Sequence, residues 1–179
     1  SLMQRLILMR HAKAEASAPG GDVDRALSER GLRDAAAMGR ALAERGLRPD
    51  LALVSGAVRT RETWERLHED FGDVEVRYEP GLYNASAERL RRSVEAAGDE
   101  AGCLLILAHN PGVHLLAVKY LEEAAASPPP AGPVTVQVTR GDLTEQTTVL
   151  ATAARSEAVS VAVPAPAEGR GVVTRSGAI

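Results

Sequence analysis

The stretch Leu6-Ile7-Leu8-Met9, followed at once by Arg10-His11, decides the fold expected of this chain. A short run that is apolar at every position is typical of a strand buried on both faces of a parallel sheet. The stretch from Cys103 to Ala108 repeats the pattern and is followed by His109. The sequence therefore predicts two inner strands, each with a histidine directly after its carboxyl end.

Segments with helical periodicity alternate with such strands. Further strands are predicted over 51–54 and 74–78, and helices over 28–45, from 57 to about 70, over 86–97 and from Pro111 onward. Strands that alternate with helices form βαβ units, in which helices cover both faces of the sheet. We therefore expect an α/β fold with three layers, α/β/α, around a mainly parallel sheet.

The pattern weakens after Tyr120. A proline-rich turn over 128–133 precedes strand-like runs at 134–139, 147–152 and 158–163, and residues 165–179 have the composition of a loose tail. These features predict a single domain over 3–164, followed by the tail.

Composition narrows the class of protein. The 179 residues (18.9 kDa) are 45% hydrophobic and 25% charged, which excludes a wholly disordered chain. A net charge of −3 and a pI near 5.8 argue against a general partner role with nucleic acid or an anionic membrane. One cysteine, Cys103, and no apolar run long enough for a signal peptide or a membrane helix favour a cytoplasmic location.

The two histidines mark the expected functional edge. The carboxyl ends of parallel strands border the crevice in which α/β proteins bind ligands. If the two strands are neighbours, His11 and His109 open into one pocket although they lie 98 residues apart. Each has a polar neighbour in sequence, Arg10 and Asn110.

The arginines allow two interpretations. Arg59 is expected in the first turn of a helix, where free backbone N–H groups already favour an anion, so Arg10, Arg25 and Arg59 can converge on a phosphate. Alternatively, Arg59 and Arg61 form a solvated helix face together with acidic neighbours, Glu62 and Glu65. Composition alone favours the solvated face.

Several other chemistries lack support in the sequence. The carboxylates near the histidines do not have the spacing of metal ligands, and there is no His-Glu-x-x-His pattern. There is also no Walker-type phosphate loop and no Gly-x-Ser-x-Gly elbow. We therefore expect neither a metal nor an organic cofactor.

Three motifs in this order carry a family resemblance: Leu-Met-Arg10-His11, Ser55-x-x-x-Arg59-x-x-x-Thr63 and Ala-His109-Asn110-Pro-Gly. Together they resemble the histidine phosphatase superfamily, over about residues 4–122. The short chain and two further stretches, Asp24-Arg25-Ala-Leu-Ser28 and Leu82-Tyr83-Asn84-Ala85, are similar to its SixA-type phosphohistidine phosphatases.

The resemblance implies a phosphoglycerate-mutase-like fold and a set of site residues. His11 would be the nucleophile, and Arg10, Arg59 and His109 would form the phosphate pocket. Arg25 and Asn110 would be further phosphate-binding residues. A backbone carbonyl or a carboxylate on the far ring nitrogen is expected to hold His11 in the reactive tautomer.

The chain departs from the family pattern at two points. Ala12 follows the first histidine where many members have glycine, a small change. No residue matches the carboxylic acid that protonates the leaving group in larger relatives. Glu79 is near in sequence but does not align with that motif, and a solvated charge at a strand end explains it as well.

The expected function is a metal-independent phosphatase that works through a phosphohistidine intermediate and acts on a phosphohistidine-bearing protein. One alternative is a phosphatase for small phosphomonoesters in the same pocket. Another is a non-catalytic module that binds phosphate or phosphoprotein, which the intact His11 and His109 disfavour because a binder needs no nucleophile.

Overall fold

The structure is a computed structural model of the chain and describes residues 3, 5–126, 136–137, 148–153 and 157–162. At its centre is a sheet whose strands lie in the order β3-β2-β4-β1-β7-β6-β5. Their bounds are β1 Arg5–Arg10, β2 Leu51–Ser55, β3 Glu75–Glu79, β4 Cys103–Ala108, β5 Val136–Gln137, β6 Thr148–Ala153 and β7 Glu157–Ala162. The first five strands in this order run parallel, and β6 and β5 pair antiparallel at one edge. The expectation of a mainly parallel α/β sheet is confirmed.

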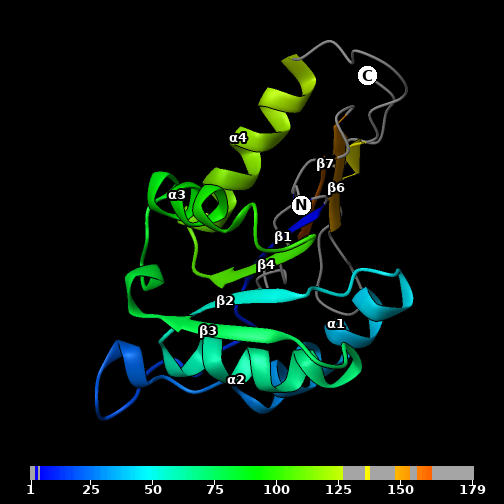
Figure 1. Cartoon of the computed structure of the whole chain (residues 1–179). Coiled ribbons are helices and arrows are strands. Elements are labelled where there is room, and N and C mark those ends of the chain that lie inside the picture. The colour runs from blue at the N-terminus through cyan, green and yellow to red at the C-terminus, as the bar shows by residue number, and fades with distance from the viewer. Residues whose placement is uncertain (1–2, 4, 127–135, 138–147, 154–156, 163–179) are drawn as a thin grey trace.

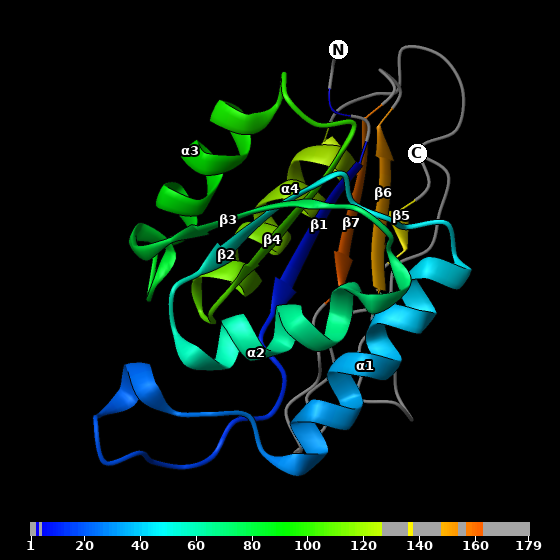
Figure 2. The ribbon, with the colours of Figure 1, turned by 60° about the horizontal axis from the view of Figure 1, so that its bottom comes forward.

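Helices cover both faces of this sheet, as Figures 1 and 2 show. α1 and α2 lie on one side, and α3 and α4 lie on the other. Their bounds are α1 Glu29–Glu44, α2 Val58–Leu67, α3 Ala87–Ala97 and α4 Gly112–Ala126, and three short 3-10 turns join them: η1 Asp22–Asp24, η2 His68–Asp70 and η3 Pro80–Leu82.

The side chains of β1 explain the three layers. Leu6 and Leu8 pack into a core with α3 and α4, whereas Ile7 and Met9 pack into a second core with α1 and α2. Because successive side chains of a strand point to opposite faces, an uninterrupted apolar run is buried only between two layers of helices.

Helices α1 and α3 each begin directly after a serine that caps the first turn. The hydroxyl of Ser28 accepts a hydrogen bond from the N–H of Gly31, and that of Ser86 accepts one from Arg89. Each satisfies a backbone donor that the first helical turn leaves free.

The remaining differences from the predicted elements are small. The helix predicted to reach Asp70 ends at Leu67 and continues as the turn η2, and α4 begins at Gly112, one residue after Pro111. Of the strands predicted after Tyr120, the parts described are β5, β6 and β7, and their pairing is now defined. The domain bounds at 3–164 remain a prediction, and the predicted tail at 165–179 lies outside the described residues.

Two glycines allow neighbouring backbone segments to pack closely against each other. A Cβ atom on Gly39 would lie 2.2 Å from the carbonyl oxygen of Leu67, so α1 and α2 touch there without side chains between them. A Cβ atom on Gly112 would lie 2.1 Å from the carbonyl oxygen of Ala85. The start of α4, just after His109, is therefore held directly against the segment that precedes α3.

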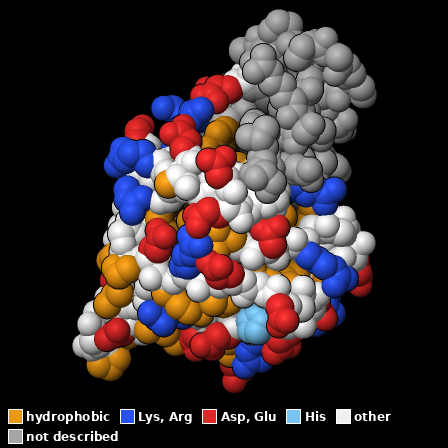
Figure 3. All heavy atoms as spheres, viewed as in Figure 1, with side chains coloured by type: hydrophobic (Ala, Val, Ile, Leu, Met, Phe, Trp, Pro, Cys, Tyr) orange, Lys and Arg blue, Asp and Glu red, His pale blue; other side chains and the backbone are white. Residues whose placement is uncertain are grey.

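Acidic and basic side chains are interspersed on the described part of the face seen in Figure 3, with no continuous basic stripe there. Within the described part of the chain, none of the helices combines the length and the apolar character needed to cross a bilayer.

Candidate active site

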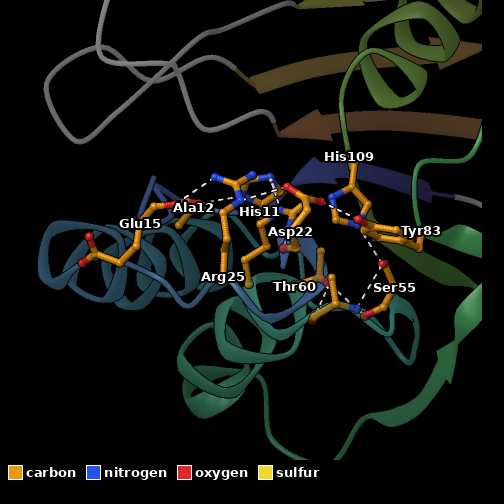
Figure 4. A network of polar contacts seen from close by, with 11 residues as sticks. His11, Ala12, Glu15, Asp22, Arg25, Ser55, Thr60, Tyr83 and His109 are labelled. Carbon is orange, nitrogen blue, oxygen red and sulfur yellow. Dashed lines mark hydrogen bonds and ion pairs between the residues drawn. The ribbon is translucent and has the colours of Figure 1, made fainter. Parts of the chain in front are cut away.

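The two histidines meet at the carboxyl edge of the sheet. β1 and β4 are parallel neighbours, and their last residues, Arg10 and Ala108, stand opposite each other. The residues that follow, His11 and His109, are both buried, and their ring centroids lie 5.3 Å apart. The expectation that both imidazoles face one site is confirmed, and Figure 4 shows them within one polar network.

Hydrogen bonds at both ring nitrogens fix the orientation and the tautomer of His11. Its Nδ1 lies 2.7 Å from the carbonyl oxygen of Ala12, and its Nε2 lies 3.2 Å from the Nε of Arg59. A guanidinium can only donate, so Nε2 must accept and the proton of the neutral ring is on Nδ1. The group expected on the far nitrogen is thus the Ala12 backbone carbonyl.

Burial lowers the pKa of His11 to about 3, and the nearby charges of Arg10 and Arg59 act in the same direction. The ring is therefore neutral at physiological pH, as a nucleophile must be. The peptide that orients it is itself anchored, because the N–H of Ala12 donates to the hydroxyl of Thr63 at 3.0 Å. Thr63 is the last residue of the second motif.

Arg59 is buried, with 3% of its surface exposed, so the interpretation of a solvated helix face is wrong for this residue. It projects from the first turn of α2 toward His11 and donates to the backbone and the carboxylate of Asp22 at 2.8 and 3.1 Å. Arg61 does lie on the exposed side, over the ring of Tyr78. Helical periodicity identifies the side that packs on the sheet, but the first turn of a helix also faces the sheet edge.

Asp22 is the main site residue that sequence reasoning missed. Its carboxylate accepts hydrogen bonds from Arg25 at 2.9 Å, from Arg59 and from the hydroxyl of Tyr83. The hydrogen bond from Tyr83, together with the charge of Arg59, lowers the pKa of Asp22 to about 2, so the group is an anion. A carboxylate thus occupies guanidinium donors that would also suit a phosphate.

His109 has two partners that come from other elements. The hydroxyl of Ser55, at the end of β2, lies 2.7 Å from its Nε2, and the ring of Tyr83 meets it edge-on at 5.4 Å between centroids. Burial, with the charge of Arg59 next in effect, lowers the pKa of His109 to about 4. Ser55 and Tyr83 both stand in the quoted motifs, yet nothing in the sequence pairs them with His109.

The other predicted residues lie around this centre. Arg10 ends β1 and is half-buried, and its charge lowers the pKa of both histidines. Arg25 binds Asp22 and the carbonyl of Glu15. The buried side-chain oxygen of Asn110 has no hydrogen-bond partner among the described residues.

Glu79 ends β3 opposite Ser55, on the same edge of the sheet. Within the described part of the chain, no hydrogen bond or ion pair joins it to either histidine. The described residues also include no group of three histidine, cysteine, aspartate or glutamate side chains that could hold a metal ion. The positive charge at the histidines comes from the guanidinium groups.

This arrangement suits phosphoryl transfer. A neutral imidazole can attack phosphorus with its Nε2 lone pair once a phosphoryl group takes the place of the N–H of Arg59. The guanidinium donors around it can stabilise the charge on the equatorial oxygens.

Comparison with known families agrees with this chemistry. The model of the histidine phosphatase superfamily (branch 1) matches residues 6–101. An uncharacterized protein of Mycobacterium tuberculosis is 34% identical over 110 residues, which cover 62% of this chain and 68% of that protein. An uncharacterized chloroplastic protein of Arabidopsis thaliana is 32% identical over 123 residues, covering 63% of this chain and 56% of that protein.

Solved structures share the fold across most of the chain. One is proposed to be the phosphohistidine phosphatase SixA of Agrobacterium tumefaciens, with 31% identity, a TM-score of 0.63, and coverage of 84% of this chain and 93% of that chain. A second structure, with the same proposed identity in Nakamurella multipartitia, has 25% identity, a TM-score of 0.64, and coverage of 88% and 91%.

Proposed function

The chain belongs to branch 1 of the histidine phosphatase superfamily and is a phosphatase, and from this premise we propose that it dephosphorylates protein phosphohistidine through a covalent intermediate on His11. The observation that carries the proposal is the state of His11: neutral, with the proton on Nδ1 and the Nε2 lone pair beside Arg59.

The reaction has two balanced steps. In the first, the Nε2 lone pair of His11 forms a bond to phosphorus while the bond from phosphorus to the substrate nitrogen breaks, and the departing imidazole takes up a proton from solvent water. In the second, water attacks the phosphohistidine, releases phosphate and returns the lone pair to Nε2. In this scheme the phosphoryl oxygens are bound by Arg10, Arg25, Arg59, His109 and Asn110. These contacts stabilise the negative charge that the oxygens carry in both transition states.

Two features of the site's rim support a protein substrate. Between β3 and α3 the chain contains only η3 and a short connection, so no subdomain is inserted in this part of the described chain. The outer residues remain accessible, since half of the Asp22 side chain is exposed. An open edge admits a phosphorylated side chain that stands on a folded partner, whereas an enzyme for metabolites gains by enclosing its ligand.

An exposed apolar side chain lies at the same rim. Val23 and Leu115 are the two large hydrophobic residues that are exposed in the described chain, and Val23 directly follows Asp22. An apolar contact beside the site would stabilise a complex with a protein surface but would not touch a small phosphate ester.

The chemistry of the leaving group favours the same substrate class. The carboxyl group of Asp22 lies in the site, but its pKa of about 2 leaves it ionised and a poor proton donor, and Glu79 makes no contact with the histidines among the described residues. A phosphoramidate nitrogen leaves more readily than an alkoxide and depends less on such an acid.

The test is a substrate panel with a phosphohistidine-bearing protein, a sugar phosphate and an aryl phosphate. We expect kcat/KM for the phosphoprotein to exceed that for the sugar phosphate by about tenfold or more, equivalent to ~1.4 kcal/mol. Equal or better turnover of the sugar phosphate would instead support a small-molecule phosphatase.

Two variants sharpen the test. Quenching during turnover with labelled substrate should give acid-labile, alkali-stable label that disappears in His11→Ala and persists in His114→Ala, where an exposed histidine is removed. Val23→Ser should raise KM for the phosphoprotein but not for the aryl phosphate, and Leu115→Ser serves as its matched control. Label on His109 would overturn the role of His11.

A further inference from the structure

In the hydrogen bond between Ser55 and His109, the surroundings determine which group donates. The hydroxyl oxygen of Ser55 lies 2.7 Å from Nε2 of His109, and both residues are almost fully buried. The distance by itself allows either group to donate. The other contacts of the serine decide which one does.

The Ser55 hydroxyl has one other partner among the described residues, the backbone N–H of Ala57 at 3.4 Å. That N–H is a donor and occupies a lone pair of the hydroxyl. The hydrogen of the hydroxyl therefore has one available acceptor, Nε2 of His109 (Figure 4). A hydroxyl that donates to Nε2 requires this nitrogen to be unprotonated.

The opposite tautomer leaves two groups unsatisfied. If Nε2 of His109 carried the proton and donated to Ser55, the buried hydroxyl hydrogen would face no acceptor, which is costly in a protein interior. Nδ1, which has no partner among the described residues, would then carry a buried lone pair without a donor.

The other ring nitrogen of His109 supplies an independent observation. Nδ1 is buried and has no hydrogen-bond partner within the described part of the chain. His109 itself is 3% exposed and lies beside His11, with 5.3 Å between the ring centroids. A buried N–H without an acceptor is explained if a ligand provides the acceptor, and phosphoryl oxygens are acceptors only.

We propose that Ser55 is a positioning residue: its hydroxyl donates to Nε2 of His109 and so holds the ring in the Nδ1–H tautomer that donates to a phosphoryl oxygen during transfer to His11. This inference rests on the proposed phosphoryl transfer at His11, but the tautomer is a property of the free enzyme. Its failure and that of the proposed function can therefore be distinguished.

The hydroxyl of Ser55 can be removed without dismantling the turn that carries it. The backbone carbonyl of Ser55 accepts a separate hydrogen bond from the Thr60 hydroxyl at 2.8 Å, and that hydroxyl also contacts the carbonyl of Ala57 at 2.9 Å. Ser55→Ala keeps these contacts and loses, besides the hydrogen bond to His109, only the long one from the N–H of Ala57, so the His109→Gln background is needed to separate the two effects.

The deciding experiment is ¹⁵N NMR of the imidazole rings in the free wild-type protein at neutral pH, with His109 assigned by its loss in His109→Gln. We expect a protonated Nδ1 and an unprotonated Nε2. A protonated Nε2 with an unprotonated Nδ1 would overturn the proposal, and this measurement needs no Ser55 variant to fold.

Kinetics then test whether the tautomer matters for the reaction. Ser55→Ala should lower kcat/KM by about tenfold to a hundredfold and give a mixture of His109 tautomers. The same substitution made in His109→Gln should cost little more, because the hydroxyl acts through that ring. Ser93→Ala, which removes a buried serine hydroxyl from α3, is the control and should leave the kinetics unchanged.

The outcomes of the kinetic test are distinct. A full additional loss from Ser55→Ala in the His109→Gln background would show that Ser55 acts by another route. A correct tautomer in a protein that forms no label on His11 would refute the proposed function and leave the tautomer assignment standing.

Discussion

The Nε of Arg59 donates a hydrogen bond of 3.2 Å to Nε2 of His11, so the lone pair of the proposed nucleophile is bound to a buried cation. The same guanidinium uses its other nitrogens on Asp22. Its forked donors thus join the proposed nucleophile to the Asp22 anion, and a bound phosphoryl group would have to replace both partners.

Replacing Arg59 tests this central role. Arg59→Ala should lower kcat/KM by about 10²–10³-fold, the usual cost of removing a charge-stabilising donor. Arg61→Ala is the matched control, because Arg61 lies on the exposed side of α2 over Tyr78. It should change kcat/KM less than about twofold, within the usual range for surface substitutions. Similar losses in both variants would contradict the assignment.

Asp22 is expected to compete with bound phosphate. Because its carboxylate is ionised and occupies Arg25 and Arg59, Asp22→Asn should bind vanadate or inorganic phosphate more tightly, by about threefold to tenfold. Asp24→Asn, in the same 3-10 turn, is the control. Inhibition constants measure the change. Weaker binding in Asp22→Asn would mean that Asp22 mainly holds the arginines in place.

Stability should fall as the solution is acidified from neutral pH. The folded pKa values of His11 and His109, about 3 and about 4, lie below the ordinary value of 6.5, so the unfolded chain binds more protons between these limits. The free energy of unfolding should drop by about 1.4 kcal/mol per pH unit for each histidine below pH 6.5. Denaturant titrations from pH 7 to 5 measure how steeply the free energy of unfolding changes with pH. In His11→Gln this dependence should be weaker, because one proton fewer is taken up on unfolding. An unchanged slope in that variant would count against a neutral buried His11.

The approach of α4 to the residue before Ser86 should tolerate no side chain at Gly112. Gly112→Ala places a Cβ atom 2.1 Å from the carbonyl oxygen of Ala85 and should destabilise the protein by about 2 kcal/mol or more. Gly98→Ala is the control, because Gly98 has helical dihedral angles and its nearest neighbour would lie at 3.4 Å. It should be neutral or slightly stabilising. Thermal unfolding compares the two, and equal melting temperatures would refute the clash.

Chelation should leave the reaction intact. The guanidinium groups of Arg10, Arg25 and Arg59 provide the positive charge that a metal supplies in other phosphatases. Full activity is expected after treatment with EDTA. A loss that added Mg²⁺ or Zn²⁺ restores would overturn this expectation.

Local patterns predicted the strands and the proximity of His11 and His109. The apolar runs before the two histidines and the helical periodicity of α1 and α3 report on their immediate neighbourhood, which is encoded within a few residues. For Arg59, composition alone favoured a solvated face, whereas the family resemblance implied a place in the phosphate pocket. The apolar stripe of α2 could not decide between them, because it describes packing on the sheet and carries no information about a partner beyond the end of the helix.

The sequence by itself determined the α/β layers and the motif residues proposed to carry the chemistry, because burial on two faces and helical periodicity depend on short-range order. Only the tertiary structure decided that Tyr83 meets Asp22 and Ser55 meets His109, across 61 and 54 residues of chain. Such contacts arise where separate elements end at one edge of a sheet. The direction of each hydrogen bond there depends on every neighbour of the donor, and no local pattern encodes that arrangement.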